Sequence, residues 1–287
     1  MKNILTIITL LPTLLCAQEW KAGDWPVLRH YDQQHFVSDS FASWGNRYRN
    51  RIIRRTGRLR DWEIMNVPGK KYSTVTTGNN APFFAIYTKP EKGEAQTTLL
   101  AGALYDQEYL HYEGRPVNHH GLPRFKNSSF DAAYPFGQVH LSDKEIPVEV
   151  TVKGFNPLVP GDAEASGIPI AVLCYEVTNT SQTPVDVSIC GSIRNFIGKD
   201  GSKFVTDWKG DYIPVGCKDN RNIYKSAQGL QGIYFCSEGV EKTDPAYGNM
   251  TLVTNAPEGV TYRTSSKADD WSNGILASGT TSVQTVN

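Results

Sequence analysis

Short apolar or alternating segments, each bounded by turn residues, recur along the chain and most constrain its fold. Glycine, proline, asparagine or aspartate punctuates the sequence between them. Segments of this length and pattern are typical of β-strands. The pattern therefore predicts an all-β chain with strands over 83–87, 97–104, 137–141, 148–152, 168–177, 185–189, 232–236 and 250–253.

The alternation within these segments predicts which face of each strand is buried. Val148, Val150 and Val152 alternate with polar residues, and segment 185–189 repeats the pattern. Because successive strand side chains point to opposite faces, each strand should have one buried and one wet face. Segments 168–177 and 185–189 flank a turn over 179–184, which predicts a hairpin. No capped stretch of helical period exceeds about ten residues, so we expect a large two-sheet β-sandwich.

The net charge argues against a nucleic-acid partner. Lysine and arginine number 29 and aspartate and glutamate 29, so the formal net charge is zero. A local basic run interleaves aromatic residues at Trp44 and Tyr48 with Arg47, Arg49, Arg51, Arg54, Arg55, Arg58 and Arg60. Such a run can bind polyanions. We interpret the basic run instead as a poorly packed loop.

The first seventeen residues have the form of a secretory signal peptide. Lys2 precedes an apolar run over 4–15, and polar residues follow from Gln18. This run is shorter than the roughly twenty residues that span a bilayer, so no stable membrane span is expected. Leu15 before Cys16 disfavours a lipoprotein anchor. We expect an exported, periplasmic or extracellular protein with a mature domain over 18–287.

Neither cysteines nor histidines predict a metal site. Cys174, Cys190, Cys217 and Cys236 form no CxxC motif, and buried thiols or one disulfide are both compatible with export. The histidines are His30, His35, His111, His119, His120 and His140, of which the adjacent pair suits a loop. The sequence has no GxSxG and no GxxxxGK[ST] motif. No metal and no cofactor are expected.

Aromatic residues allow a binding function as an alternative. Exposed rings can stack on sugars, whereas rings in a sandwich usually belong to its core. The candidates are Tyr105, Tyr109, Tyr112, Trp208, Tyr212, Tyr224 and Trp271.

Residues 154–196 carry a family resemblance. The strings at 155–162 (Phe-Asn-Pro-Leu-Val-Pro-Gly-Asp), 166–172, 175–180 and 194–195, with 59–66 and 81–85 upstream, resemble the N-terminal β-domain of glycoside hydrolase family 116. This is the non-lysosomal glucosylceramidase and β-glucosidase family. The resemblance implies a β-sandwich that packs against an (α/α)6 helical domain. It also implies that the catalytic carboxylates belong to that helical domain, which this chain lacks.

The sequence contains two pairs of closely spaced carboxylates. Glycosidases use two carboxylates as nucleophile or base and as acid. Asp61 and Glu63, and Asp162 and Glu164, are each two residues apart. We interpret the first pair as a polar strand rim and the second as a turn, with no catalytic residue in the chain. We expect contact with the helical domain at Asp61, Trp62, Glu63, Asp162 and Glu164.

The segment 37–58 departs from the family pattern. Where the family has a glycine-rich strand and turn, this chain has a run without the expected glycines. Codons permitted for these residues, read one nucleotide later, can spell Leu-Gly-Gly-Ile-Gly-Thr-Gly. We therefore expect a frameshift near 35–37, restored before Leu59. Residues 278–286, read one nucleotide earlier, can spell Phe-Trp-Asp-Asp-Phe.

Two functions remain open from the sequence. The first is a truncated, inactive N-terminal domain of an exported β-glycosidase, with its last strand not closed. The second is a free-standing carbohydrate-binding β-sandwich. A third, weaker alternative is a sandwich that docks a separately encoded helical domain.

Overall fold

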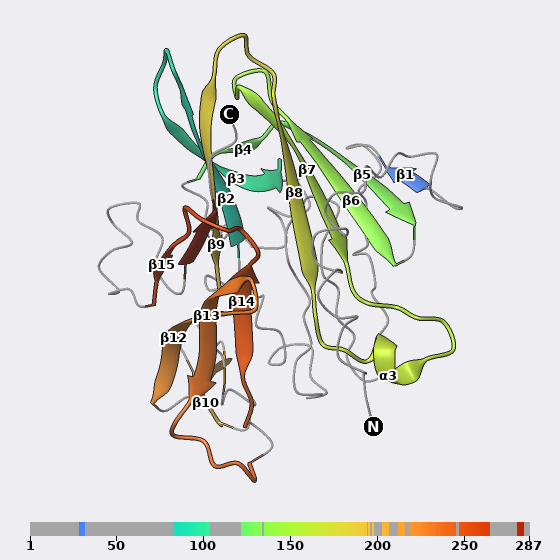
Figure 1. Ribbon diagram of the computed structural model, residues 1–287, viewed down its shortest axis with the longest axis vertical. Helices are drawn as coiled ribbons and strands as arrows, with labels where there is room; N and C mark the ends of the chain where they lie inside the picture. Colours follow the sequence, from blue (N-terminus) through green and yellow to red (C-terminus); the bar gives the residue numbers. More distant parts are fainter. Residues whose placement is uncertain are drawn as a thin grey trace, which may run out of the picture.

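The computed structural model describes residues 29–31, 83–103, 122–133, 135–193, 195, 197, 203–206, 212–215, 219–244, 247–264 and 280–283. Within these ranges the regular structure is almost entirely β. Figure 1 shows two larger sheets and smaller ones beyond the end of β9. The predicted all-β class is confirmed, and the described elements form a sandwich.

The first large sheet has five strands, each antiparallel to its neighbours. Its order is β1-β5-β6-β7-β8. The strands are β1 (Arg29–Tyr31), β5 (Asn127–Ala133), β6 (Phe136–Ser142), β7 (Val148–Phe155) and β8 (Val172–Asn179).

The second large sheet has six strands in the order β15-β16-β9-β2-β3-β4. All neighbours are antiparallel except β3 and β4. The strands are β2 (Phe83–Pro90), β3 (Gln96–Gly102), β4 (Arg124–Phe125), β9 (Val185–Ser192), β15 (Thr261–Arg263) and β16 (Thr280–Val283).

The remaining elements are two smaller sheets and one short helix. The antiparallel sheet β12-β13-β14 and the hairpin β10-β11 lie at the same end of the molecule (Figure 1). Their bounds are β10 (Lys203–Thr206), β11 (Tyr212–Val215), β12 (Asn220–Ala227), β13 (Leu230–Ser237), β14 (Met250–Thr254) and α3 (Ala163–Ser166).

The main core lies between the two large sheets. Val148, Val150 and Val152 of β7 are buried, while Glu149 between them is exposed, as the alternation predicts. The same cluster includes Ile86, Leu100, Phe125, Phe130, Ala132, Val139, Leu141, Ile146, Val185 and Val187. Each fully buried apolar side chain contributes about 1.5–3 kcal/mol relative to its exposed state. Apolar faces from both sheets therefore hold the sandwich together.

A second core lies beneath the β12-β13-β14 sheet. Ile193, Ile197, Ile233 and Phe235 are buried there, with Met250 and Leu252 packed against them. Asn195 joins this sheet to the segment after β9. Its Nδ2 donates to the carbonyls of Arg221 and Cys236 at 3.1 and 3.0 Å, and its Oδ1 accepts from the Ile197 amide.

The predicted hairpin between segments 168–177 and 185–189 is wrong. Strand β8 pairs with β7 in the five-stranded sheet, whereas β9 pairs with β2 and β16 in the other. The connection over 180–184 therefore crosses from one sheet to the other. Asn179 organises it by accepting from the Ser181 amide and donating to the Thr183 carbonyl, both at 2.9 Å.

One strand begins later than predicted. Residues 168–171 precede β8 as irregular chain, in which the Asn156 side chain donates to the Ile170 carbonyl and the Ile170 amide donates to the Ile168 carbonyl. Near the C-terminus, β16 pairs with β15 on one side and with β9 on the other.

Candidate functional site

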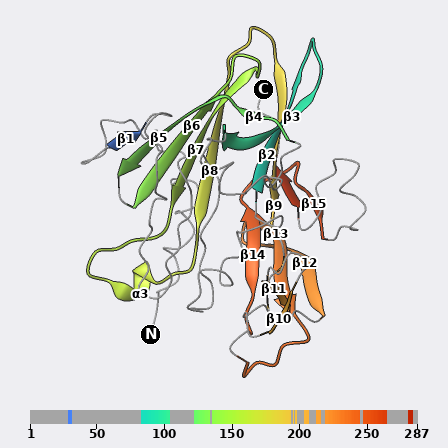
Figure 2. The same cartoon turned by 180° about the vertical axis from the view of Figure 1, so that it is seen from behind.

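The long connection between β7 and β8 is the first candidate surface. Figures 1 and 2 show it extending away from the strands, with α3 near its tip. Side chains close it upon itself. Ser166 Oγ accepts from the Val159 amide at 2.9 Å and donates to the Val159 carbonyl at 3.0 Å. The connection, residues 156–171, is called the β7–β8 loop from here on.

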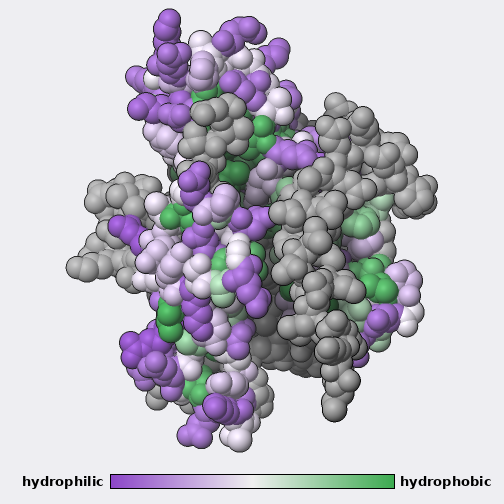
Figure 3. All heavy atoms as spheres, viewed as in Figure 1, coloured by the Kyte–Doolittle hydropathy of each residue, from purple (hydrophilic) through white to green (hydrophobic). Residues whose placement is uncertain are grey.

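The β7–β8 loop carries exposed apolar side chains. Val159, Ile168 and Ile170 are 47%, 46% and 50% exposed, and α3 has no buried residue. Figure 3 shows hydrophobic residues on the visible face only as separate small groups among hydrophilic ones. The three side chains are thus accessible on one loop whose backbone is held by its own hydrogen bonds.

The predicted contact residues Asp162 and Glu164 lie on this loop. Asp162 is the N-cap of α3, and its Oδ1 accepts from the amides of Glu164 and Ala165 at 3.0 and 2.9 Å. This capping role matches the interpretation of the pair as a turn. Glu164 is exposed in the first turn. Asp61, Trp62 and Glu63 lie outside the described residues.

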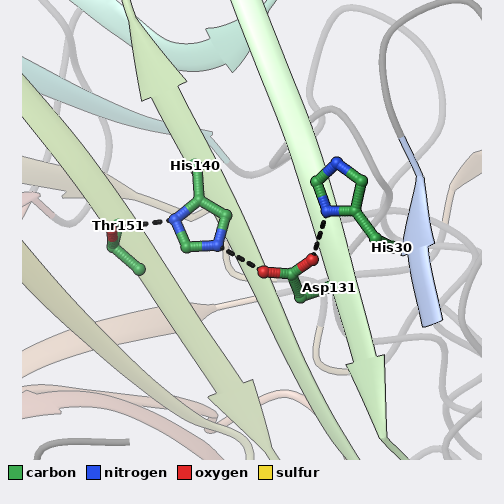
Figure 4. Close-up of polar contacts among 4 residues, drawn as sticks. All are labelled: His30, Asp131, His140 and Thr151. Atoms are coloured by element: carbon green, nitrogen blue, oxygen red, sulfur yellow. Dashed lines mark hydrogen bonds and ion pairs between the residues drawn. The ribbon is translucent and has the colours of Figure 1, made fainter. Parts of the chain in front are cut away.

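A chain of polar contacts crosses the outer face of the five-stranded sheet (Figure 4). His30 Nδ1 lies 2.5 Å from Asp131 Oδ1, and His140 Nε2 lies 2.8 Å from Asp131 Oδ2. The Thr151 hydroxyl lies 3.2 Å from His140 Nδ1. We call this group the His–Asp–His chain.

The Asp131 carboxylate is the shared partner in the His–Asp–His chain. Its two oxygens contact different histidines, Oδ1 with His30 Nδ1 and Oδ2 with His140 Nε2. The other ring nitrogen of His140 contacts the Thr151 hydroxyl. Both carboxylate oxygens of Asp131 are thereby engaged, and the arrangement ties edge strand β1 to β5 and β6. The contacts of the His–Asp–His chain therefore have a structural role.

The sequence did not predict the His–Asp–His chain, because its members are brought together only by strand register. His30 pairs with Asp131 across β1 and β5, although 101 residues separate them. His140 pairs with Thr151 across β6 and β7. Two residues beyond Thr151 on β7, Lys153 is buried on the same face and pairs with Glu176 of the neighbouring strand β8, which departs from the predicted wet face. The alternating pattern predicts that such residues face outward, but it does not predict which residues they contact.

The structure also describes some of the predicted cysteines and the other residues of the kinds that bind metals. Cys190 and Cys236 carry free thiols, and burial raises the pKa of Cys190 to about 11. Cys217 lies outside the described residues. Within the described ranges no three His, Cys, Asp or Glu side chains are placed to hold a metal. The helical part of that same region contains no segment long and apolar enough to cross a membrane.

Of the candidate aromatics, one has a described side chain. Tyr224 is half-buried and stacks on Tyr262 of β15 with ring centroids 4.0 Å apart. Tyr212 lies in β11, whose side chains are not described. Tyr105, Tyr109, Tyr112, Trp208 and Trp271 lie outside the described residues.

The fold defines a β-sandwich domain with an extended loop. Comparison with known families then assigns the chain. The N-terminal domain model of glycosyl-hydrolase family 116, described as that of β-glucosidase 2, matches residues 52–285. The chain therefore belongs to this family of N-terminal domains, and the full enzymes of the family have a catalytic domain as partner. A search of the curated proteins finds no match.

Proposed function

We propose that this chain is the non-catalytic N-terminal β-domain of an exported β-glycosidase and docks a helical catalytic domain through its β7–β8 loop. The family match over residues 52–285 carries the proposal. The signal-peptide pattern of residues 1–17 supports export, and residues 18–287 would form the mature domain. On this proposal the chain alone hydrolyses no glycoside.

The exposed apolar residues support the choice of docking surface. Ile168 and Ile170 are about half exposed, yet the hydrogen bonds of Ser166 and Asn156 order the backbone around them. An ordered loop loses little conformational entropy on binding. Glu164 adds an acidic group at the rim, so the matching surface should combine apolar and basic residues.

Binding to a separately expressed family-116 helical domain tests the proposal. The double variant Ile168→Ser/Ile170→Ser should weaken association at least tenfold, measured by titration calorimetry. Ile223→Ser is the matched control, because Ile223 is 42% exposed on β12, away from the loop. Wild-type chain that does not bind, or equal weakening by both variants, would contradict it. Hydrolysis of p-nitrophenyl β-glucoside by the chain alone would refute the non-catalytic assignment.

We also propose that residues 37–58 are read out of frame. The support is the missing glycines and the codons that can restore them. The corresponding reading of residues 278–286 also stays a prediction for the nucleotide sequence to test. The nucleotide sequence decides: codons that cannot spell the glycine-rich string would remove the proposal.

A further inference from the structure

Tyr224 and Tyr262 form a flat aromatic surface where two sheets meet. Tyr224 lies on β12 of the three-stranded sheet, and Tyr262 lies on β15 of the six-stranded sheet. The ring planes differ by 9° at a centroid separation of 4.0 Å. Offset parallel stacking is one of the arrangements that aromatic pairs prefer. The two rings therefore stabilise each other where the two sheets meet.

Hydrogen bonds on both sides fix the two rings. Tyr224 Oη donates to Gln231 Oε1 at 2.8 Å, and Gln231 Nε2 donates to the Ala256 carbonyl at 2.7 Å. Asn222, on the same side of β12, donates to the Thr264 carbonyl at 2.7 Å. This last bond ties the chain just beyond β15 to β12. The pair is thus preorganised before any ligand arrives.

The outer ring remains open to solvent. Tyr262 is 50% exposed although one of its faces lies against Tyr224. The stack with Tyr224 thus leaves about half of the Tyr262 surface accessible to solvent. Ser226, two residues beyond Tyr224 on the same side of β12, is exposed and polar. A flat apolar face with polar groups at its rim suits a ligand that is amphipathic in the same way.

We propose that the Tyr224–Tyr262 pair is a non-catalytic platform that binds β-linked gluco-oligosaccharides. In such sugars the hydroxyls are equatorial, so the ring face presents C–H groups while the rim presents hydrogen-bonding groups. The face stacks on Tyr262 and the hydroxyls meet polar side chains such as Ser226. Only the choice of β-linked glucose rests on the proposed function; the platform itself rests on the ring geometry.

Titration of the full chain with cellopentaose, followed by saturation-transfer NMR and calorimetry, tests the platform. Tyr262→Ala should weaken binding at least tenfold, while Tyr262→Phe, which keeps the ring, should bind within twofold of wild type. Tyr262→Leu keeps an apolar cover over Tyr224 and should also lose binding, which separates the ring from folding. Tyr247→Ala is the matched control, because Tyr247 is 44% exposed and lies before β14.

The outcomes separate the platform from the docking proposal. Wild-type chain that does not bind cellopentaose, or a Tyr262→Leu variant that binds like wild type, would overturn the platform. Equal affinity for maltopentaose would overturn the preference for β-linkage. Ile168→Ser/Ile170→Ser should leave cellopentaose affinity unchanged, because the β7–β8 loop is not part of the platform.

Discussion

Asn195 shows how one polar side chain can join two parts of the fold. It is buried, and its amide nitrogen also lies 2.9 Å from Asn222 Oδ1, besides the carbonyls of Arg221 and Cys236. Asn195→Ala would remove the buried amide that all three acceptors share. We expect a loss of about 3 kcal/mol in the free energy of unfolding, measured by urea denaturation. Asn249→Ala, an exposed control, should stay within about 0.5 kcal/mol of wild type.

Replacing Thr88 should raise the free energy of unfolding. Its hydroxyl is buried in β2 and has no hydrogen-bond partner within the part of the chain that the structure describes. Thr88→Val removes this desolvated hydroxyl at nearly constant volume, so stability should rise by about 1 kcal/mol. Thr178→Val on the exposed side of β8 serves as control. A destabilised Thr88→Val protein in urea denaturation would contradict the assignment.

Cys190 should make stability depend on alkaline pH. Burial raises the pKa of its thiol from 9.0 to about 11, so the folded state holds its proton where the unfolded state has lost it. The free energy of unfolding should therefore fall as the pH rises from about 9 to about 11. Burial also raises the pKa of Tyr175, which acts in the same direction. Cys190→Ala should make the dependence shallower; an unchanged slope between pH 8 and 10.5 would count against this.

At the scale of elements, a side-chain contact adds to the backbone pairing that holds β1. It has three residues and lies at the edge of its sheet, where His30 contacts Asp131. Asp131→Ala removes the shared acceptor of His30 and His140. Amide exchange in residues 29–31 should accelerate at least tenfold, measured by hydrogen–deuterium exchange. Asp186→Ala, exposed on β9, is the matched control and should leave β1 protection unchanged.

Individual elements also show what the sequence could predict. Strands β2, β3, β6, β7, β9, β13 and β14, and most of β8, were expected because their apolar residues alternate or run continuously. Strand β12 was missed because its sequence is mostly polar and has no apolar alternation. It forms a strand by pairing with β13 along its whole length. The β8–β9 hairpin was wrong because sequence neighbours need not pair when a sandwich offers each strand a different sheet. The His–Asp–His chain required the register of four strands.

At the scale of the whole molecule, the family resemblance supplied what local patterns could not. Alternation predicted a sandwich, but the strings around 155–195 pointed to the particular N-terminal domain family that the match over 52–285 confirms. The exposure of Val159, Ile168 and Ile170 was not predictable, because an apolar loop sequence reads like a buried strand. The structure shows these residues on the outside, where a partner can cover them.

The central claim is that the β7–β8 loop is the surface that meets the helical catalytic domain. Hydrogen–deuterium exchange of the chain, alone and in complex with that domain, measures this most directly. We predict that residues 156–171 gain protection in the complex, while residues 220–227 of β12 exchange as before. A complex in which β12 is protected and the β7–β8 loop is not would contradict the account.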